Sequence, residues 1–386
     1  MEPNATVRVV LKKGREKPVR MGHPWIFSGA IERVHGHPQA GDSCQVVTAE
    51  GSHLGYGYYN AQSVISVRML STSNTAFDAD ALRRRIRHAL SLRHNLVSNE
   101  TDSCRLINSE GDFLPGLIVD KVGAGLVLQI LTYGMERFRE VIVESLASCC
   151  SPEFIFERSD SDARKKEGLP KKEGVILGTV AEQIDIKENG LTYVVDVTSG
   201  QKTGYFFDQR QNRKLLRSFV EGKSVCDCFS YSGGFATNAL GGGASHVDVV
   251  DIKSNAIAWA KENVSRNFPS DHRADFVCAD IFKYLRDAPQ KWDCIICDPP
   301  KFAKHANEVK RAARGYKDIN LCALKKLNKS GVLFTFSCSQ AVDVRLFRQI
   351  VFAAAADSGR QVQLLHSLTA GSDHPINIAH MEGEYL

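Results

Sequence analysis

The stretch VCDCFSYSGGFA, residues 225–236, decides how the second half of the chain folds. The apolar run from Val225 to Phe229 predicts a strand, and Gly233 and Gly234 predict a tight turn at which a helix opens. From here on, strand and helix patterns alternate. The strands are expected at His246–Asp251, Asp275–Ala279, Cys294–Cys297, Val332–Ser337 and Val362–Leu365, and the helices at Gly234–Ala239, Ser254–Asn267, Tyr316–Leu327 and Val344–Ala355. This alternation predicts an α/β, Rossmann-like fold with a ligand site beyond the carboxyl ends of a parallel sheet.

The first half of the chain does not alternate strand and helix patterns in this way, and its patterns predict two further domains. Residues 1–75 contain short strand patterns between Gly, Pro and His turns and predict a small β-barrel. Residues 76–197 mix strand patterns with a helical pattern at Asp80–Asn95 and predict a central α+β domain. This domain is expected to end in a β-hairpin, because Asn189-Gly190 lies between alternating apolar residues. Residues 198–386 form the third domain.

The composition is that of an ordinary globular protein: 386 residues, 43% hydrophobic and 24% charged. No apolar run reaches the roughly 18 residues of a transmembrane helix, and residues 1–20 hold no apolar signal core, so we expect a cytoplasmic protein. The 11 cysteines are scattered through apolar runs and show no repeated zinc-type spacing. We therefore expect reduced, buried thiols and no metal site.

A net charge of +5 is weak support for a nucleic-acid partner, but two local clusters are more basic. Arg83, Arg84, Arg85 and Arg87 crowd one helical stretch, and Arg164, Lys165, Lys166, Lys171 and Lys172 crowd a predicted loop. Each cluster either contacts phosphates or forms a solvated face.

Acidic residues end three successive strands and point to the cofactor. Asp227 precedes the glycine-rich turn and can accept from an ammonium group, whereas the GxGxxG spacing of dinucleotide sites and the lysine of a phosphate loop are lacking. Asp251 can accept from two ribose hydroxyls, and Asp280 can accept from an adenine amino group. Any one of them could instead cap a helix. Three in register predict a site for S-adenosylmethionine.

Two further strand ends carry the reaction chemistry. Asp298 opens the stiff turn DPPKF, residues 298–302, and Cys338 follows the next predicted strand. Because neighbouring strand ends meet, we expect the thiol of Cys338 beside Asp298, where it can add to carbon 6 of a pyrimidine and activate carbon 5. Asp298 can bind the amino group and the protonated N3 of cytosine, whereas uracil presents a carbonyl there. The alternatives are an inert cysteine and a rigid strand exit.

The segment 200–210, GQKTGYFFDQR, precedes the sheet and offers further candidate contacts. Arg210 can reach the cofactor carboxylate, and Tyr205 or Phe206 can stack on a base. An interdomain hinge with an apolar anchor is the other interpretation.

Seven stretches of the chain resemble the bacterial 23S rRNA large-subunit (cytosine-5)-methyltransferase family. They lie at residues 22–30 (GHPWIFSGA), 108–120 (NSEGDFLPGLIVD), 203–210, 229–236, 298–302, 315–320 (GYKDIN) and 336–339. The resemblance implies a PUA domain that binds RNA in residues 1–75, a class I S-adenosylmethionine-dependent methyltransferase domain, 23S rRNA as partner and a homodimer. It implies that Cys338 is the catalytic cysteine and that the cofactor contacts Asp227, Phe229, Ser230, Tyr231, Gly233, Asp251, Asp280 and Asp298.

Two features depart from related patterns. Another group of RNA cytosine-5 methyltransferases has a second cysteine just after its double proline, where this chain, like the family it resembles, has none and carries Lys301. Family members also continue beyond the position of Glu384-Tyr385-Leu386 into a last strand, so that edge strand is trimmed or short here.

Two other functions stay open. Relatives with the same fold methylate guanine at a ring nitrogen and need no thiol at Cys338, and a non-catalytic RNA-binding assembly factor could keep the fold.

Overall fold

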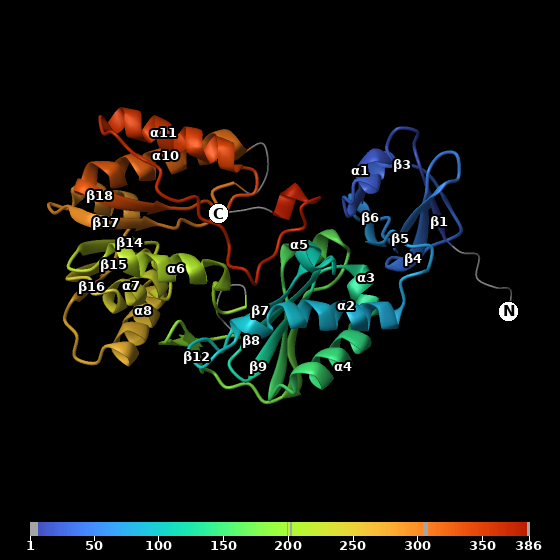
Figure 1. Ribbon diagram of the computed structural model, residues 1–386, viewed down its shortest axis with the longest axis horizontal. Coiled ribbons are helices and arrows are strands. Elements are labelled where there is room, and N and C mark those ends of the chain that lie inside the picture. The colour runs from blue at the N-terminus through green and yellow to red at the C-terminus, as the bar shows by residue number, and fades with distance from the viewer. Residues whose placement is uncertain (1–6, 199, 201–202, 304–307, 384–386) are drawn as a thin grey trace. The chain divides into compact units, whose positions relative to one another are not determined.

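The computed structural model describes residues 7–198, 200, 203–303 and 308–383 and divides the chain into two compact units (Figure 1). The first contains the described residues of 1–184, 195–207 and 372–383, and the second those of 185–194 and 208–371. Gln201 and Lys202, in the segment before the sheet, and Glu384–Leu386 lie outside the described residues. None of the helices in the described part of the chain is long and apolar enough to cross a membrane.

The first unit begins with a six-stranded sheet in the order β2-β6-β5-β4-β1-β3. Its strands are β1 (Arg8–Leu11), β2 (Trp25–Phe27), β3 (Ile31–His35), β4 (Asp42–Val47), β5 (His53–Tyr59) and β6 (Ile65–Ser71), with the short helix α1 (Lys17–Arg20). Alternate residues such as Val9, Leu11, Val46 and Val67 point into one apolar core. The alternation of apolar residues therefore produces a β-sheet in the region where the sequence predicts a small β-barrel.

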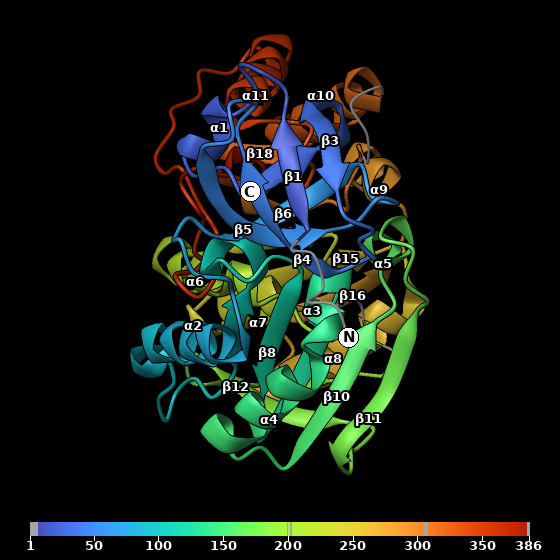
Figure 2. The ribbon, with the colours of Figure 1, turned by 90° about the vertical axis from the view of Figure 1, so that its right-hand side faces the viewer.

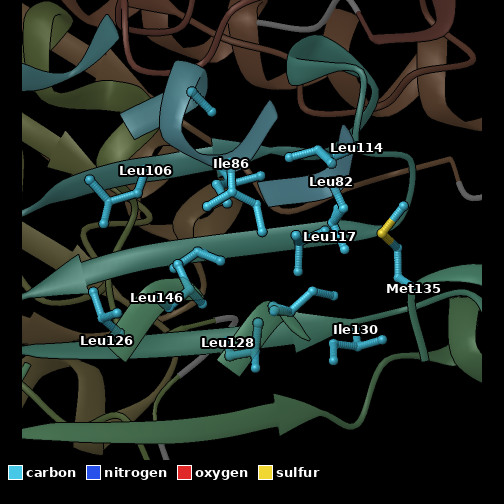
Figure 3. Packing of buried hydrophobic residues seen from close by; sticks show 14 of the residues in the cluster. Leu82, Ile86, Leu106, Leu114, Leu117, Leu126, Leu128, Ile130, Met135 and Leu146 are labelled. Atoms are coloured by element: carbon cyan, nitrogen blue, oxygen red, sulfur yellow. The ribbon is translucent and has the colours of Figure 1, made fainter. Parts of the chain in front are cut away.

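The central sheet of the first unit has the order β11-β10-β9-β8-β7. Its strands are β7 (Cys104–Asn108), β8 (Leu117–Val122), β9 (Gly125–Ile130), β10 (Phe154–Ser159) and β11 (Lys172–Gly178). The helices are α2 (Ala79–Leu92), α3 (Tyr133–Arg137), α4 (Arg139–Cys150) and α5 (Asp162–Lys166). α2 and α4 lie beside the strands of this sheet (Figure 2), and Leu82 and Ile86 of α2 and Leu146 of α4 share one apolar cluster with Leu126 and Leu128 of β9 (Figure 3). The apolar faces of the two helices and of the sheet thus form one shared hydrophobic core.

The structure changes the interpretation of both basic clusters. Arg164 is only 1% exposed and donates to the backbone carbonyls of Ile130 and Pro170, so it is a buried structural residue and cannot contact a phosphate. In the other cluster, Arg83 pairs with Asp80, and Arg85 donates to the carbonyl of Phe113. Arginines adjacent in sequence point in different directions around a helix, so a local cluster overstates the exposed charge.

The second unit holds a hairpin and a parallel sheet. The hairpin pairs β12 (Ile184–Glu188) with β13 (Leu191–Val195), as Asn189-Gly190 predicts, and the sheet has the order β16-β15-β14-β17-β18. The strands are β14 (Ser224–Cys228), β15 (His246–Asp251), β16 (Ala274–Cys278), β17 (Trp292–Cys297) and β18 (Leu327–Thr335). The helices are α6 (Arg210–Leu216), α7 (Gly234–Gly241), α8 (Ser254–Asn267), α9 (Ile281–Asp287), α10 (Val309–Lys326) and α11 (Val344–Ser358). Every pairing in this sheet is parallel.

The helices cover both faces of the parallel sheet, as the alternating pattern predicts. Val225 and Ile296 face α7 and α8, whereas their chain neighbours Cys226 and Ile295 face α9, α10 and α11. The fold is therefore α/β and Rossmann-like. The prediction of a strand at Val362–Leu365 is wrong: residues 360–371 form neither helix nor strand, and Val362, Leu364 and Leu365 are exposed. An apolar run becomes a strand only where a neighbouring strand pairs with it.

A buried ion pair fixes the hairpin to α6. Nε and Nη2 of Arg213 donate to the two carboxylate oxygens of Glu188, at 2.7 and 2.6 Å, and both side chains are buried. Replacing Glu188 with glutamine leaves a buried positive charge with a neutral neighbour, so we expect about 3–5 kcal/mol less stability in urea unfolding. The matched control is Glu262→Gln, which removes the exposed pair with Arg266 and should cost less than about 1 kcal/mol. Equal losses in the two variants would contradict the prediction.

Candidate active site

The carboxyl ends of the parallel strands bring the predicted residues to one edge of the sheet. Cys228 of β14 lies opposite Cys297 of β17, which in turn lies opposite Thr335 of β18. Asp298 and Phe229 each follow directly after their strand, and the amide of Phe336 donates to the carbonyl of Cys297 at 3.0 Å. Parallel pairing thus places the glycine-rich turn, the double-proline turn and the segment of Cys338 side by side.

The glycine-rich turn has an unusual backbone. Phe229 and Tyr231 adopt positive φ angles of 62° and 48°, which non-glycine residues rarely do. Gly233 has a φ of 74°, and a Cβ there would lie 2.9 Å from the Cβ of Ala260, so only glycine fits. The amide of Ser230 donates to Val250, and that of Gly233 donates to Ser230. The turn is therefore strained but held in place, as is common where backbone must approach a ligand.

Asp227 is a buried carboxyl group directly beneath this turn. It is 1% exposed and accepts one hydrogen bond, from the amide of Ala236 at 2.9 Å. Burial raises the pKa of Asp227 to about 8, against the lowering effect of that hydrogen bond, and the negative charges of Asp298 and Asp251 raise it further. A carboxyl group with this environment favours a cationic ligand, because a nearby positive charge would relieve the cost of ionisation.

The hydroxyl of Ser230 is a second feature that suits a ligand. It is buried, and among the described residues its Oγ has no hydrogen-bond partner. A buried hydroxyl without a partner is costly unless a bound molecule supplies one. The adjacent Tyr231 packs edge-on against Trp259 of α8, with ring centroids 5.8 Å apart. Trp259 was not among the residues predicted from sequence.

Asp251 and Asp280 both support local backbone. Asp251 accepts from the amides of Tyr231 and Lys253, one at each oxygen, and so connects the end of β15 to the glycine-rich turn. Asp280 caps α9 by accepting from the amide of Lys283 at 2.9 Å. Asp280 is therefore a helix cap, as the alternative interpretation of these aspartates predicts. Its exposed carboxylate lies at the same edge of the sheet as the other strand ends.

The thiol of Cys338 lies against the double-proline turn. Its Sγ donates to the carbonyl oxygen of Pro299 at 3.7 Å, and the residue is partly exposed. Pro299 directly follows Asp298, whose Oδ2 accepts from Nε2 of Gln209 at 3.1 Å. Gln209 is itself oriented by Asn212, which donates to its Oε1 at 2.7 Å. The expected closeness of the Cys338 and Asp298 segments is present.

A clamp that the sequence did not reveal holds these two segments together. The Oγ of Ser339 accepts from the amides of Phe302 and Ala303, both at 3.1 Å, and lies 2.9 Å from the hydroxyl of Tyr316. The ring of Tyr316 packs on Phe302 with centroids 4.7 Å apart. Ser339 and Tyr316 thus hold the double-proline turn and the Cys338 segment in position. In the sequence, both residues lie within the stretches 336–339 and 315–320 that resemble the methyltransferase family.

The segment before the sheet divides between the two units. Arg210 is buried at the start of α6 in the second unit. Tyr205 belongs to the first unit, is 2% exposed and packs edge-on against Phe207 at 5.3 Å. Of the two rings predicted to stack on a base, Tyr205 is therefore excluded because its ring is already enclosed by protein, whereas Phe206 is partly exposed and stays a prediction.

Comparisons with known proteins agree with this geometry. Residues 172–335 match the model of a family described as S-adenosylmethionine-dependent methyltransferase, and residues 9–72 match a PUA-like domain. A solved chain from Streptococcus mutans, assigned as a SAM-dependent methyltransferase, has the same fold at 23% identity, with a TM-score of 0.84 over 98% of this chain and 97% of the other. A methyltransferase structure solved as a complex with SAH gives a TM-score of 0.85 over the same shares, also at 23% identity.

Relatives in the curated proteins are closer in sequence. A protein named ribosomal RNA large subunit methyltransferase I from Shewanella denitrificans is 42% identical over 98% of both chains. Its namesake from Aliivibrio fischeri is also 42% identical, over 99% of this chain and 98% of the relative. The cofactor is S-adenosylmethionine. At this identity over nearly the full length of both proteins, the chain belongs to the ribosomal RNA large subunit methyltransferase I family.

Proposed function

We propose that this protein transfers a methyl group from S-adenosylmethionine to carbon 5 of a cytosine in 23S rRNA, with Cys338 as a covalent nucleophile. The family name supplies the large-subunit rRNA target. The observation that supports the choice of base is the Cys338 thiol, 3.7 Å from the carbonyl of Pro299, the residue that follows Asp298. A methyltransferase acting on a ring nitrogen needs no thiol at this position.

The residues at the glycine-rich turn fit the cofactor. When bound, S-adenosylmethionine supplies an electrophilic methyl group on its sulfonium. We propose that Asp227 accepts from its ammonium group, that Asp251 accepts from the ribose hydroxyls, and that Asp280 accepts from the adenine amino group through the oxygen that does not cap α9. Phe229, Ser230, Tyr231, Gly233, Asp298 and Arg210 complete the proposed set. Two observations support the fit: the buried hydroxyl of Ser230, which finds no hydrogen-bond partner among the residues that the structure describes, and the raised pKa of Asp227.

Cys338 makes carbon 5 of the base reactive. Its thiolate forms a bond to carbon 6 of cytosine, and the electron pair of the 5,6 double bond forms a new bond from carbon 5 to the methyl group. The bond between that methyl group and the sulfonium breaks, with S-adenosylhomocysteine as the leaving group. A base then removes the proton from carbon 5. The bond between sulfur and carbon 6 breaks, the double bond re-forms, and Cys338 leaves as the thiolate. To reach this edge of the sheet, the cytosine must be unstacked from its RNA neighbours.

Asp298 selects cytosine in this scheme. Its carboxylate accepts from the exocyclic amino group and from N3 once that nitrogen carries a proton, which stabilises the adduct. Uracil would direct a carbonyl oxygen at the same carboxylate and would be repelled. Gln209, 3.1 Å from Oδ2, keeps the carboxylate in orientation and acts as a positioning residue.

We also propose a division of labour along the chain. Residues 1–75 act as a PUA-like RNA-binding domain, residues 76–197 form a central α+β domain, and residues 198–386 carry the chemistry.

The test is nucleoside analysis of the product. Wild-type protein is incubated with 23S rRNA from cells lacking the gene and with labelled S-adenosylmethionine, and the digested RNA is separated by mass spectrometry. We expect 5-methylcytidine as the labelled nucleoside. A methylguanosine would overturn the choice of base but keep the cofactor site, and no transfer together with no cofactor binding would favour an assembly factor.

A further inference from the structure

We propose that the first turns of α10 and α11 form a phosphate-binding strip that holds the RNA strand next to the target base. The strip, named here the α10–α11 strip, consists of Lys310, Arg314, Arg345 and Arg348. The inference rests on the proposed RNA substrate and adds the surface that receives it. The two pairs of cations are about 30 residues apart in sequence, so no single stretch of the chain contains this surface.

The fold places the strip beside the proposed catalytic residues. α10 and α11 follow β17 and β18, the strands whose carboxyl ends lead to Asp298 and Cys338. α11 begins only six residues after Cys338, so its first turns lie at the same edge of the sheet. The two helices run side by side (Figure 1), with Ala312 and Tyr316 of α10 in one apolar cluster with Phe347 and Ile350 of α11. The rings of Tyr316 and Phe347 are 5.6 Å apart.

The charges of the strip have no structural use in the described part of the chain. Lys310, Arg314, Arg345 and Arg348 are exposed, and none forms an ion pair or hydrogen bond with a described residue. Neither helix has an acidic residue in its first turn. Cations near a helix N-terminus oppose the helix dipole, so they are unfavourable for folding. They are favourable for binding phosphate, because they add to the positive potential of the helix ends.

The carboxylates near the strip are already engaged. Glu308 pairs with Arg311 at 3.2 Å, and Asp343 caps α11 by accepting from the amide of Leu346. Lys317, one turn further along α10, pairs with Asp357 at 2.7 Å. The four cations of the strip thus remain available at the end of the helices that lies nearest Cys338.

An exposed aromatic residue extends the strip along α11. Phe352 is 73% exposed and follows Arg348 by four residues, so both lie on one helical face. Together with Val344, Arg345 and Gln349 they line an open surface hollow. Arginine beside an exposed aromatic ring is the chemistry that binds single-stranded RNA, in which cations follow the backbone and rings stack on bases. We therefore assign a single-stranded RNA segment next to the target cytosine as the occupant.

The experiment compares two double charge reversals in the full-length protein. Arg345→Glu/Arg348→Glu alters the strip, and glutamate is favourable at a helix N-terminus, so the variant should fold. Lys291→Glu/Lys329→Glu is the matched control, because it changes the net charge equally but lies before β17 and at the start of β18, the opposite edge of the sheet. RNA affinity is measured by filter binding at several salt concentrations, and calorimetry with S-adenosylmethionine checks the fold.

We expect the strip variant to bind RNA at least about tenfold more weakly at low salt. Its plot of log affinity against log salt should be less steep by roughly 1.4–1.8, the value for two lost phosphate contacts. Phe352→Ala should lower affinity about tenfold without changing that slope. The control should match wild type, and all variants should bind S-adenosylmethionine normally.

The inference is overturned if the strip variant keeps the affinity and slope of the control. Because binding is read without methylation, this result is independent of the choice of base. A methylguanosine product with weak binding by the strip variant would reject cytosine chemistry and retain the strip.

Discussion

Replacing Cys338 with alanine is expected to abolish methyl transfer while leaving cofactor affinity unchanged. Removing a covalent nucleophile commonly lowers turnover by on the order of 10⁴-fold or more, because carbon 5 of cytosine is then not nucleophilic enough to react. The variant should fold, since the thiol is partly exposed and its contact with the carbonyl of Pro299 is weak. Transfer is measured with labelled S-adenosylmethionine and 23S rRNA, and affinity by calorimetry.

Cys278→Ala is the matched control. Cys278 also ends a strand at this edge of the sheet, and its thiol likewise donates to a backbone carbonyl, that of Ile252 at 3.5 Å. It lies at the end of β16, away from the double-proline turn, so its loss should leave turnover at the wild-type level.

RNA containing 5-fluorocytidine gives an independent readout. A base can remove the hydrogen at carbon 5 as a proton but cannot remove fluorine as a cation, so the elimination that frees Cys338 is blocked. The bond between sulfur and carbon 6 then persists, and the complex survives a denaturing gel. Wild type and Cys278→Ala should form this complex and Cys338→Ala should not. Normal turnover by Cys338→Ala would end the covalent mechanism.

Replacing Asp227 with asparagine is expected to weaken cofactor binding and to stabilise the cofactor-free protein. The lost ion pair with an ammonium group should cost about 1.5–3 kcal/mol, or roughly 10- to 150-fold in Kd at pH 8. In the folded protein the pKa of Asp227 is about 8, so the group is largely protonated at neutral pH. Because the unfolded chain ionises near pH 4, the burial of this carboxyl costs stability as pH rises from 4 towards 8.

Asparagine never ionises, so the variant escapes that cost. A gain of about 1 kcal/mol would raise Tm by ~2–4 °C for a unit of this size. Asp275→Asn, an exposed aspartate of β16, should change neither Tm nor Kd by a comparable amount.

The pH dependence of cofactor binding follows from the same group. Below pH 8 a cationic ligand must displace a proton from Asp227, so wild-type Kd should fall about tenfold for each unit that pH rises from 6 towards 8 and then level off. In Asp227→Asn the Kd should be weak and nearly constant over that range. A wild-type Kd that does not change between pH 6 and 8 would contradict the role proposed for Asp227.

The amino-acid sequence by itself determined the parallel sheet and the identity of its strand ends. Strand and helix patterns depend on side chains a few residues apart, and parallel strands necessarily bring their carboxyl ends together. For this reason the sequence alone predicts that Asp227, Asp251, Asp298 and Cys338 lie at one edge of the parallel sheet. The hairpin at Asn189-Gly190 followed for the same local reason.

Only the tertiary structure decided what depends on burial or on partners distant in sequence. In the folded protein Tyr205 and Arg164 are buried by residues distant in sequence. Within the described part of the chain, Val362–Leu365 has no neighbouring strand with which to pair. It raised the pKa of Asp227 by removing water, and it joined Ser339 to Tyr316 and Phe302. It also packed α10 on α11 through Ala312, Tyr316 and Ile350, two helices that are distant in sequence. Solvation and packing depend on the whole fold, whereas the periodicity of a strand or helix is contained in its own residues.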